Sequence, residues 1–468
     1  MSPSSPERAA TPTSSANRAG LSGTLRTPSA SALAIALVVA LVSVICSIGA
    51  DARWLVAMGR IVIDSGSIPD YVPYAAASSS GWHNVPLLAE LVFYGLDAAL
   101  GDHGLLLAQL AAVTVASTVL AAGMRRAGAG QAAAALSFLL VAAASLSAFA
   151  VVRVQLFSLV LFPFLLLLLR SEARAPTRRI WLLVPLFVLW SNLHGAALVG
   201  VAVAGSYLIL ERGRRRPIES AAILVLSALA LLATPALGST ASYYVGVLEN
   251  EAAARGVGLW APLSLTAPLD IVFLAAAVPL LWLAVRSRPS LWELGALAGL
   301  ALITIQSARG GVWLAFMLAA PAAAGLRPLR ERSIRLGGVL LGLSAAIVVA
   351  GVVRGPLPID VSDELIQRTL REAAGTPVLA EPVAGEQVAA AGGRVWLANP
   401  LDAFSPEDQR LYLDWLEGKR SAADPRFADI SVVLTRKGSD AELEVRKLAG
   451  ARRIAADDGY LLIRLKPR

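Results

Sequence analysis

A series of apolar runs, several of bilayer length, limits the folds open to this chain. The first run, Ala30 to Ala50, has about the twenty residues that a spanning helix needs. Backbone groups in lipid must form their hydrogen bonds within the protein, so the runs predict helices. Together they predict a mainly α, polytopic membrane helix bundle of about 11 spans. The further runs lie at about 103–123, 129–149, 155–169, 180–193, 195–210, 218–237, 268–285, 291–307, 311–326 and 336–353.

Composition excludes the soluble and disordered classes. Hydrophobic residues make up 56% of the chain and charged residues only 16%, against roughly 25% charged in soluble proteins. The formal net charge is +8, but residues 1–354 carry 25 Arg and 15 acidic residues, while residues 355–468 carry 16 basic and 18 acidic residues. The basic excess therefore lies in the membrane part, where topology explains it better than a nucleic-acid partner does.

Arginine clusters indicate how the chain is threaded. They follow every second apolar run, at 125–126, 170–179, 212–216, 286–288 and 327–335, whereas the other exits carry isolated arginines. By the positive-inside rule these loops and the N-terminus face the cytoplasm. An odd number of spans puts the C-terminal part outside. We expect a multi-pass protein of the plasma (inner) membrane.

Three regions follow from this topology. Residues 1–29, rich in Ser, Pro, Ala and Thr, predict a disordered cytoplasmic tail. Residues 30–354 form the transmembrane domain, whose long first outer loop, 51–102, predicts two short interfacial helices. Residues 355–468 predict a small extracytoplasmic α/β domain. Its expected helices are Leu365–Ala373, Pro406–Leu416 and Asp440–Ala449, and its expected strands are 394–398, Ile430–Thr435 and Tyr460–Leu465.

A small set of polar residues falls on the predicted outer face. Ionisable groups at membrane depth are candidate functional sites. Arg153 and Arg309 run against the positive-inside bias, and guanidinium binds phosphate in a bidentate manner. Simpler roles stay open: either arginine can snorkel to lipid headgroups, Asp51 can end the first span, and His194 can cap or pack a helix. The full set is Asp51, Arg153, Gln155, Trp190, Asn192, His194, Glu249, Glu251, Arg255 and Arg309.

Several kinds of site have no sequence signal. The three His and the scattered acidic residues show no metal-ligand spacing, and no Gly-rich phosphate loop is present. Cys46 is the single cysteine, so no disulfide can form within one chain. We expect no metal and no cofactor.

The outer-face motifs together resemble the GT-C class of integral-membrane glycosyltransferases, and within it a poorly characterised bacterial branch. The resemblance covers nearly the whole chain, and its Trp-x-Asn-x-His-Gly stretch is moderately specific. The matching stretches are Asp51-Ala-Arg-Trp54, Gly59-Arg60, Gly66-Ser-Ile-Pro-Asp70, Trp82, Leu88-Ala-Glu90, Arg153-Val-Gln155-Leu-Phe-Ser158, Trp190-Ser-Asn192-Leu-His194-Gly195 and Ser307-Ala-Arg309.

The resemblance implies transfer of a hexosyl or pentosyl group from a polyprenyl phosphate to a glycan or lipid acceptor outside the membrane. Asp51 would be the base that deprotonates the acceptor. Arg153 and Arg309 would stabilise the leaving phosphate. The residues that would orient the substrates are Gln155, Asn192, His194, Trp54, Trp82 and Glu90.

The chain also departs from that pattern. The branch commonly has a His after the Trp of the first motif and a His-Glu pair before the Leu near Glu90, where this chain has Val56 and Val85-Pro86. Ala52 follows Asp51, so the adjacent acidic pair of protein mannosyltransferases is absent. Two alternatives therefore stay open: a noncatalytic membrane scaffold and a transporter of a lipid-linked saccharide. The scaffold predicts that the outer polar residues scatter, whereas the enzyme predicts that they converge.

Overall fold

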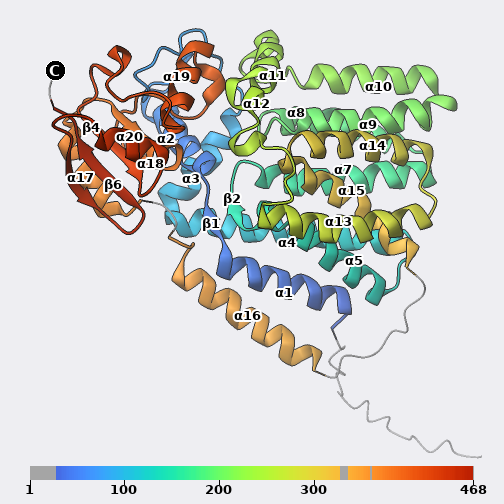
Figure 1. Ribbon diagram of the computed structural model, residues 1–468. Helices are drawn as coiled ribbons and strands as arrows, with labels where there is room; N and C mark the ends of the chain where they lie inside the picture. The colour runs from blue at the N-terminus through green and yellow to red at the C-terminus, as the bar shows by residue number, and fades with distance from the viewer. Residues whose placement is uncertain (1–27, 327–335, 359–360, 467–468) are drawn as a thin grey trace, which may run out of the picture.

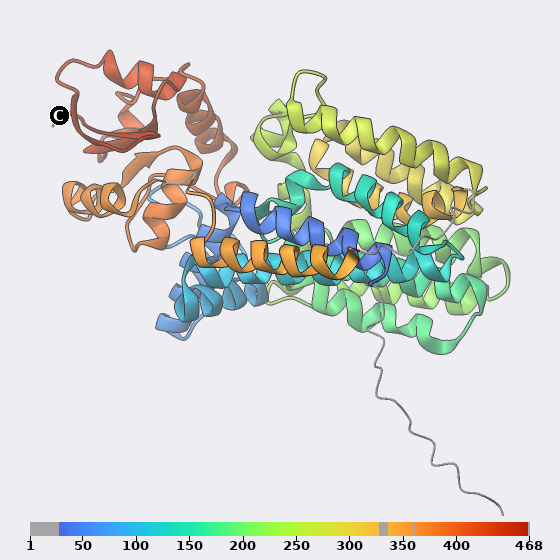
Figure 2. The same cartoon turned by 90° about the horizontal axis from the view of Figure 1, so that it is seen from below.

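The computed structural model describes residues 28–326, 336–358 and 361–466, and the protein is mainly helical (Figure 1). Nearly all of the predicted tail 1–29, and the arginine cluster at 327–335, lie outside the described residues. A helix covers each apolar run, and these helices lie roughly along one direction (Figures 1 and 2). They are α1 (Ala30–Ile45), α4 (Asp102–Arg126), α5 (Gln131–Ala144), α7 (Leu156–Arg174), α8 (Leu183–Ser191), α9 (Ala197–Leu210), α10 (Pro217–Ala230), α13 (Pro268–Arg286), α14 (Leu291–Gln306), α15 (Gly311–Gly325) and α16 (Gly337–Arg354).

The predicted count of about eleven spans is not confirmed. Within the described residues, 4 helices (α4, α7, α13 and α16) are long and apolar enough to cross a membrane, and α1, α5, α10 and α14 are shorter apolar helices. Breaks in the helices account for the difference. The run at 129–149 divides into α5 and the short α6 (Leu146–Phe149), and the run at 180–193 begins as the 3-10 turn η1 (Arg178–Leu182) before α8. Nine helical residues, as in α8, span only about 14 Å.

The arginine-rich helix ends lie together, at the end of the bundle away from the C-terminal segment (Figure 1). Arg174 on α7 donates a hydrogen bond to the carbonyl of Arg126 at the end of α4. Arg212, after α9, pairs with Glu172 at 3.0 Å, and both side chains are 2% exposed. Arg170 pairs with Glu293, in the first turn of α14, also at 3.0 Å. These contacts show that the C-terminal ends of α4, α7 and α9 and the start of α14 lie at the same end of the bundle.

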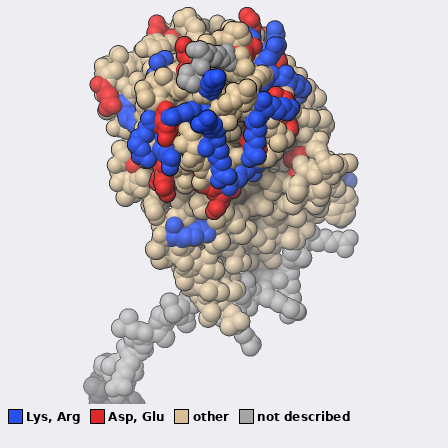
Figure 3. Space-filling model, turned by 60° about the vertical axis from the view of Figure 1, so that its left-hand side comes forward, with Lys and Arg blue, Asp and Glu red and all other residues tan. Residues whose placement is uncertain are grey.

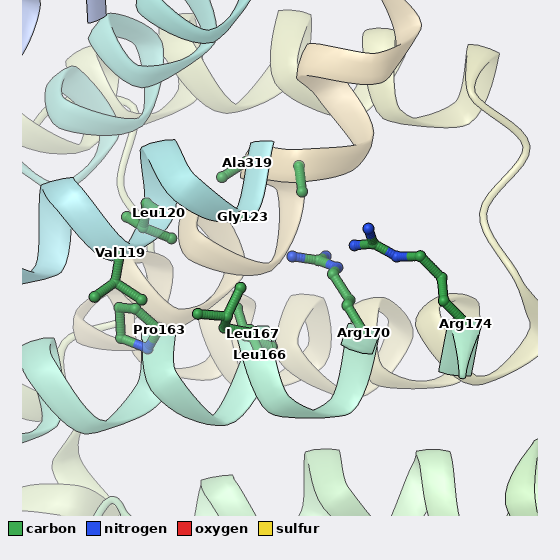
Figure 4. Close-up of a pocket in the computed structure, with 10 residues that line it drawn as sticks. Val119, Leu120, Gly123, Pro163, Leu166, Leu167, Arg170, Arg174 and Ala319 are labelled. Atoms are coloured by element: carbon green, nitrogen blue, oxygen red, sulfur yellow. The ribbon is translucent and has the colours of Figure 1, made fainter. Parts of the chain in front are cut away.

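Figure 4 shows Arg170 and Arg174 extending from α7 beside a small cavity between α4, α7 and α15. The cavity has a volume of 10 Å³, about the space that one water molecule needs. Arg170 also donates a hydrogen bond to the carbonyl of Met317 on α15, at 2.8 Å. Little empty space is therefore left between these three helices here.

α16 packs against α1 at the edge of the bundle (Figures 1 and 2). Its buried residues are Gly337, Ser344 and Gly351, which recur every seven residues. A Cβ atom at Gly351 would lie 2.6 Å from the carbonyl oxygen of Ser43 on α1. Small residues thus allow the two backbones to approach closely, as is common between membrane helices.

The predicted outer loop holds two helices, α2 (Ala50–Ser65) and α3 (Leu87–Leu100), as the sequence indicated. They cross closely, because a Cβ atom at Gly59 would lie 2.3 Å from the carbonyl oxygen of Glu90. The loop between them contacts the C-terminal segment: Tyr74 donates a hydrogen bond to the carbonyl of Asn399 at 2.5 Å. Arg60 on α2 donates to the carbonyl of Ala390 at 2.9 Å.

The C-terminal segment contains a sheet with the strand order β3-β4-β6-β5 and the helices α17–α20. β3 and β4 are parallel, and the other neighbours are antiparallel. On the face that Figure 3 shows, many charged side chains gather above a largely uncharged lower part. The elements are α17 (Asp363–Ala373), β3 (Val378–Ala380), α18 (Pro382–Ala390), α19 (Pro406–Leu416), β4 (Val432–Arg436), α20 (Asp440–Arg446), β5 (Arg452–Ala456) and β6 (Tyr460–Arg464).

The sequence located three of these helices and two of the strands, with small differences at their ends. The strand expected at 394–398 is wrong. Val395 makes only isolated bridges, one to Ala75 of the first loop and one to Val378 of β3. This segment is held between two different regions of the chain, so it does not extend a sheet. β3, α18 and β5 were not predicted.

Candidate functional site

Asp51 and Arg153 are brought together by a short parallel pair of strands. β1 (Ser47–Ile48) pairs with β2 (Val151–Val152), and each of the two residues follows its strand closely. The pairing continues as Gly49 donates a backbone hydrogen bond to Val152 at 2.9 Å. A Cβ atom at Gly49 would lie 2.9 Å from Cγ of Arg153. The absence of a side chain at Gly49 therefore lets Arg153 lie close to the start of α2.

Arg309 approaches the same place from η5 (Ala308–Gly310), between α14 and α15. Its guanidinium carbon lies 3.6 Å from the centre of the Trp260 ring, which belongs to η4 (Gly258–Trp260). A backbone hydrogen bond of 3.0 Å from Ala308 to Ala261 fixes the two turns to each other. Arg309 remains exposed and forms no ion pair within the described residues. Its charge is therefore positioned but not neutralised by direct contact.

His194 lies in the turn between α8 and α9, at the end of a buried hydrogen-bond chain. Trp190 Nε1 donates to Ser158 Oγ at 2.6 Å, and Ser158 Oγ lies 2.6 Å from His194 Nδ1. An indole N–H can only donate, so the hydroxyl hydrogen of Ser158 is free to be donated to Nδ1. This arrangement allows the neutral imidazole with its proton on Nε2.

Electrostatics connects these residues into one group. Burial, together with the positive charge of Arg309, lowers the pKa of His194 to about 3. Desolvation by burial lowers the pKa of Arg309. The negative charge of Asp51 acts against this shift, and the positive charge of Arg153 adds to it. Interactions of this kind require the groups to be near one another. The structure therefore brings together Asp51, Arg153, His194 and Arg309, all chosen from the sequence.

Three further polar residues of this region were not predicted. Glu386 on α18 is fully buried, and Asn399 donates a hydrogen bond to its Oε1. Burial raises the pKa of Glu386 well above its usual range, the charge of Asp51 raises it further, and Arg153 lowers it. Asp402, in η6 (Leu401–Ala403), and Tyr243, in α11 (Thr240–Glu249), lie nearby. A Cβ atom at Gly195 would lie 3.5 Å from the Tyr243 hydroxyl.

Asn192 and Gln155, two other predicted site residues, lie at the ends of helices. Asn192 uses its amide to donate to the carbonyls of Val188 at 2.8 Å and Ala233 at 2.6 Å. Gln155 is the N-cap residue of α7 without a capping hydrogen bond from its side chain. The Asn192 contacts join α8 to the segment after α10, so they serve packing.

The predicted tryptophans and Glu90 are buried. Trp54 is 8% and Trp82 7% exposed, so little of either ring is open for stacking against a sugar. Glu90 is fully buried and accepts a hydrogen bond from Asn84 at 2.7 Å. Burial raises the pKa of Glu90 to about 8, and the Asn84 hydrogen bond lowers it. Their side chains are therefore buried in the fold and are not exposed to a substrate.

An apolar cavity of 630 Å³ lies between α3 and α8. Its one polar lining residue is Asn192, two positions before His194. The other lining residues are Leu87, Leu88, Leu91, Val184, Pro185, Val188 and Leu189.

In the part of the chain that the structure describes, no three His, Cys, Asp or Glu side chains come together as metal ligands. No family model matches the sequence. No curated protein matches it significantly either.

Proposed function

We propose that the protein is a GT-C-type membrane glycosyltransferase, which moves a sugar from a polyprenyl phosphate to an acceptor outside the membrane. The observation that carries this proposal is the convergence of Asp51, Arg153, His194 and Arg309 from four separate segments at one end of the bundle. A scaffold has no need to gather these groups. The convergence therefore favours the enzyme over the scaffold.

The charges of the group suit a monoanionic donor. Arg153 and Arg309 contribute two positive charges and Asp51 one negative charge, while burial keeps Glu386 protonated and His194 neutral. These five groups by themselves leave one positive charge uncompensated. A sugar polyprenyl phosphate is a phosphodiester with one negative charge, and guanidinium groups bind such oxygens well. The second charge that develops on the leaving phosphate is stabilised by the same arginines.

The transfer then follows as one displacement. Asp51 takes the proton of the acceptor hydroxyl as the acceptor oxygen forms a bond to the anomeric carbon. The bond from that carbon to the phosphate oxygen breaks, and its electron pair leaves with the polyprenyl phosphate. The Nε2–H of His194 is available to donate a hydrogen bond to the sugar or the phosphate. Trp260 keeps the Arg309 guanidinium in place.

The surroundings fit a lipid-linked substrate. The cavity between α3 and α8 is lined by aliphatic side chains and suits part of a polyprenyl chain. The long apolar helices of the bundle would cross the plasma membrane, with the shared arginine-rich end in the cytoplasm. The C-terminal segment would then be an extracytoplasmic α/β domain next to the site.

The first test is mass spectrometry of the lipids that copurify with the detergent-solubilised protein. The unaltered protein is expected to carry a polyprenyl phosphate or its glycoside, and the double variant Arg153→Ala, Arg309→Ala to lose it. The matched control is Arg214→Ala, Arg215→Ala, which removes two exposed arginines at the other end of the bundle and should leave the lipid bound. Bulk phospholipid alone in all three samples would contradict the proposal and favour the scaffold.

A further inference from the structure

Buried ion pairs join two arginine-rich loops at the end of the bundle away from the C-terminal segment. Glu172, near the end of α7, accepts hydrogen bonds from Arg212 at 3.0 Å and from the backbone N–H of Thr177 at 2.7 Å. Arg212 also donates to the carbonyl of Thr177 and to Glu219 on α10, each at 3.1 Å. The loop that precedes α8 and the loop that precedes α10 are therefore held against each other.

The two joined loops carry exposed arginines whose charges are not compensated by these acidic residues. Glu172 is already paired with Arg212. Glu219 is shared between Arg212 and Arg216, and it also accepts a hydrogen bond from Trp181 Nε1 at 3.1 Å. Four further arginines are exposed and form no ion pair with any described residue. We call them the arginine patch: Arg178 and Arg179 from one loop, and Arg214 and Arg215 from the other.

The arginine patch borders an apolar surface. Leu182 is 55% and Ile218 86% exposed, and each lies three positions after a patch arginine. α8 and α10, which begin at the two loops, pack against each other (Figure 1). Exposed aliphatic side chains continue along both helices, at Val188, Leu189, Val225, Leu226 and Leu229. Positive charge at the end of an apolar surface matches a lipid, whereas a soluble polyanion makes no use of the aliphatic part.

We infer that the arginine patch binds a phospholipid with two linked phosphates, of the cardiolipin type, from the membrane leaflet at this end of the bundle. The arginine pair of each loop binds one phosphate, because guanidinium groups bind phosphate oxygens in a bidentate manner. The acyl chains lie along the exposed aliphatic residues of α8 and α10. A lipid with one phosphate engages only one loop, so the joining of two loops selects the lipid with two.

This lipid site is separate from the candidate site for sugar transfer. α8 begins at the patch, and the turn that holds His194 follows its other end. The inference therefore does not depend on the proposed function.

The test uses native mass spectrometry of the purified full-length protein in detergent, titrated with tetraoleoyl cardiolipin or with dioleoyl phosphatidylglycerol at equal phosphate. The unaltered protein is expected to bind cardiolipin at least about tenfold more tightly. The double variants Arg178→Ala, Arg179→Ala and Arg214→Ala, Arg215→Ala each remove the arginines of one loop. Each should lose at least about tenfold in affinity for cardiolipin. Each should keep its affinity for phosphatidylglycerol within about threefold, since the other loop remains.

The matched control is Arg452→Ala, Arg453→Ala, which removes two exposed arginines from β5 in the C-terminal segment and should bind both lipids normally. Thermal midpoints without added lipid show that the variants are folded, and should agree within about 2 °C because the altered side chains are exposed. Equal affinity of the unaltered protein for the two lipids would overturn the inference, and this comparison requires no variant. Undiminished cardiolipin binding in both loop variants, or an equal loss in the control, would also overturn it.

Discussion

The guanidinium carbon of Arg309 lies 3.6 Å from the centre of the Trp260 ring. This contact orients the charge of Arg309 without neutralising it, so the guanidinium edge stays available to a phosphate. A cation–π contact of this kind is worth about 0.5–1 kcal/mol at an exposed site. Trp260 was not identified from the sequence because its partner lies in a turn beyond α13 and α14.

Trp260→Leu is expected to weaken undecaprenyl phosphate binding by about two- to fivefold, the loss of one such contact. Trp260→Phe should keep part of the affinity. Trp282→Leu provides a matched control, since Arg286 lies 4.6 Å from the Trp282 ring on the exposed side of α13. Isothermal titration calorimetry measures the affinity of the unaltered protein and of the three variants. An unchanged affinity in Trp260→Leu would show that Arg309 needs no such support.

The hydrogen-bond chain from Trp190 through Ser158 predicts the tautomer of His194. The chain has 3 His, so nitrogen NMR of the protein labelled at histidine can resolve each ring. His194 should be the neutral Nε2–H form from pH 8 to about pH 4, because its pKa lies at about 3. In Ser158→Ala the Nδ1 partner is lost and a mixture of tautomers should appear. A His194 signal that becomes protonated near pH 6.5 in the unaltered protein would contradict this.

Glu90 predicts how stability depends on pH. Burial raises its pKa from 4.5 to about 8, so between these values the folded protein holds a proton that the unfolded chain has released. Stability therefore falls as pH rises from about 4.5 to about 8. Glu90→Gln, which cannot ionise, should flatten this part of the profile and raise the unfolding temperature at pH 9. Differential scanning fluorimetry at several pH values measures it, with the exposed Asp64→Asn as the control. Parallel profiles for the unaltered protein and Glu90→Gln would refute the assignment.

The contact of α16 with α1 can be tested by two glycines of one helix. A Cβ atom at Gly351 would meet the Ser43 carbonyl at 2.6 Å, whereas Gly342 has nothing within 4 Å of that position. Gly351→Ala should therefore lower the thermal midpoint, by a destabilisation of about 1–3 kcal/mol for overpacking. Gly342→Ala should be neutral or slightly stabilising. Equal midpoints for the two variants would mean that α16 is not closely packed on α1.

Much of the helical arrangement could be read from the sequence. The apolar runs located the bundle helices, and the arginine exits at Arg126, Arg174 and Arg212 indeed share one end. Hydrophobicity alone did not reveal where helices break, so the number of long spans was overestimated. The break before α8 depends on a 3-10 turn, which apolar composition does not signal.

The candidate site was predictable only in part. Asp51, Arg153, His194 and Arg309 could be selected because each is polar at the end of an apolar run. Glu386 and Asp402 lie in a segment whose composition is that of a soluble protein, where a single carboxylate attracts no attention. Their significance comes from the contact of that segment with α2 and α11, which no local pattern predicts.

The central claim is tested most directly by turnover in proteoliposomes. The purified protein is given a panel of polyprenyl-phosphate hexoses and pentoses together with neutral oligosaccharides, and mass spectrometry follows the release of polyprenyl phosphate. The unaltered protein should release it from at least one donor, Asp51→Asn should be slower by at least about a hundredfold, and Asp64→Asn, an exposed carboxylate of the same helix, should match the unaltered protein. Release at equal rates by Asp51→Asn and the unaltered protein, or no release from any donor, would contradict the account.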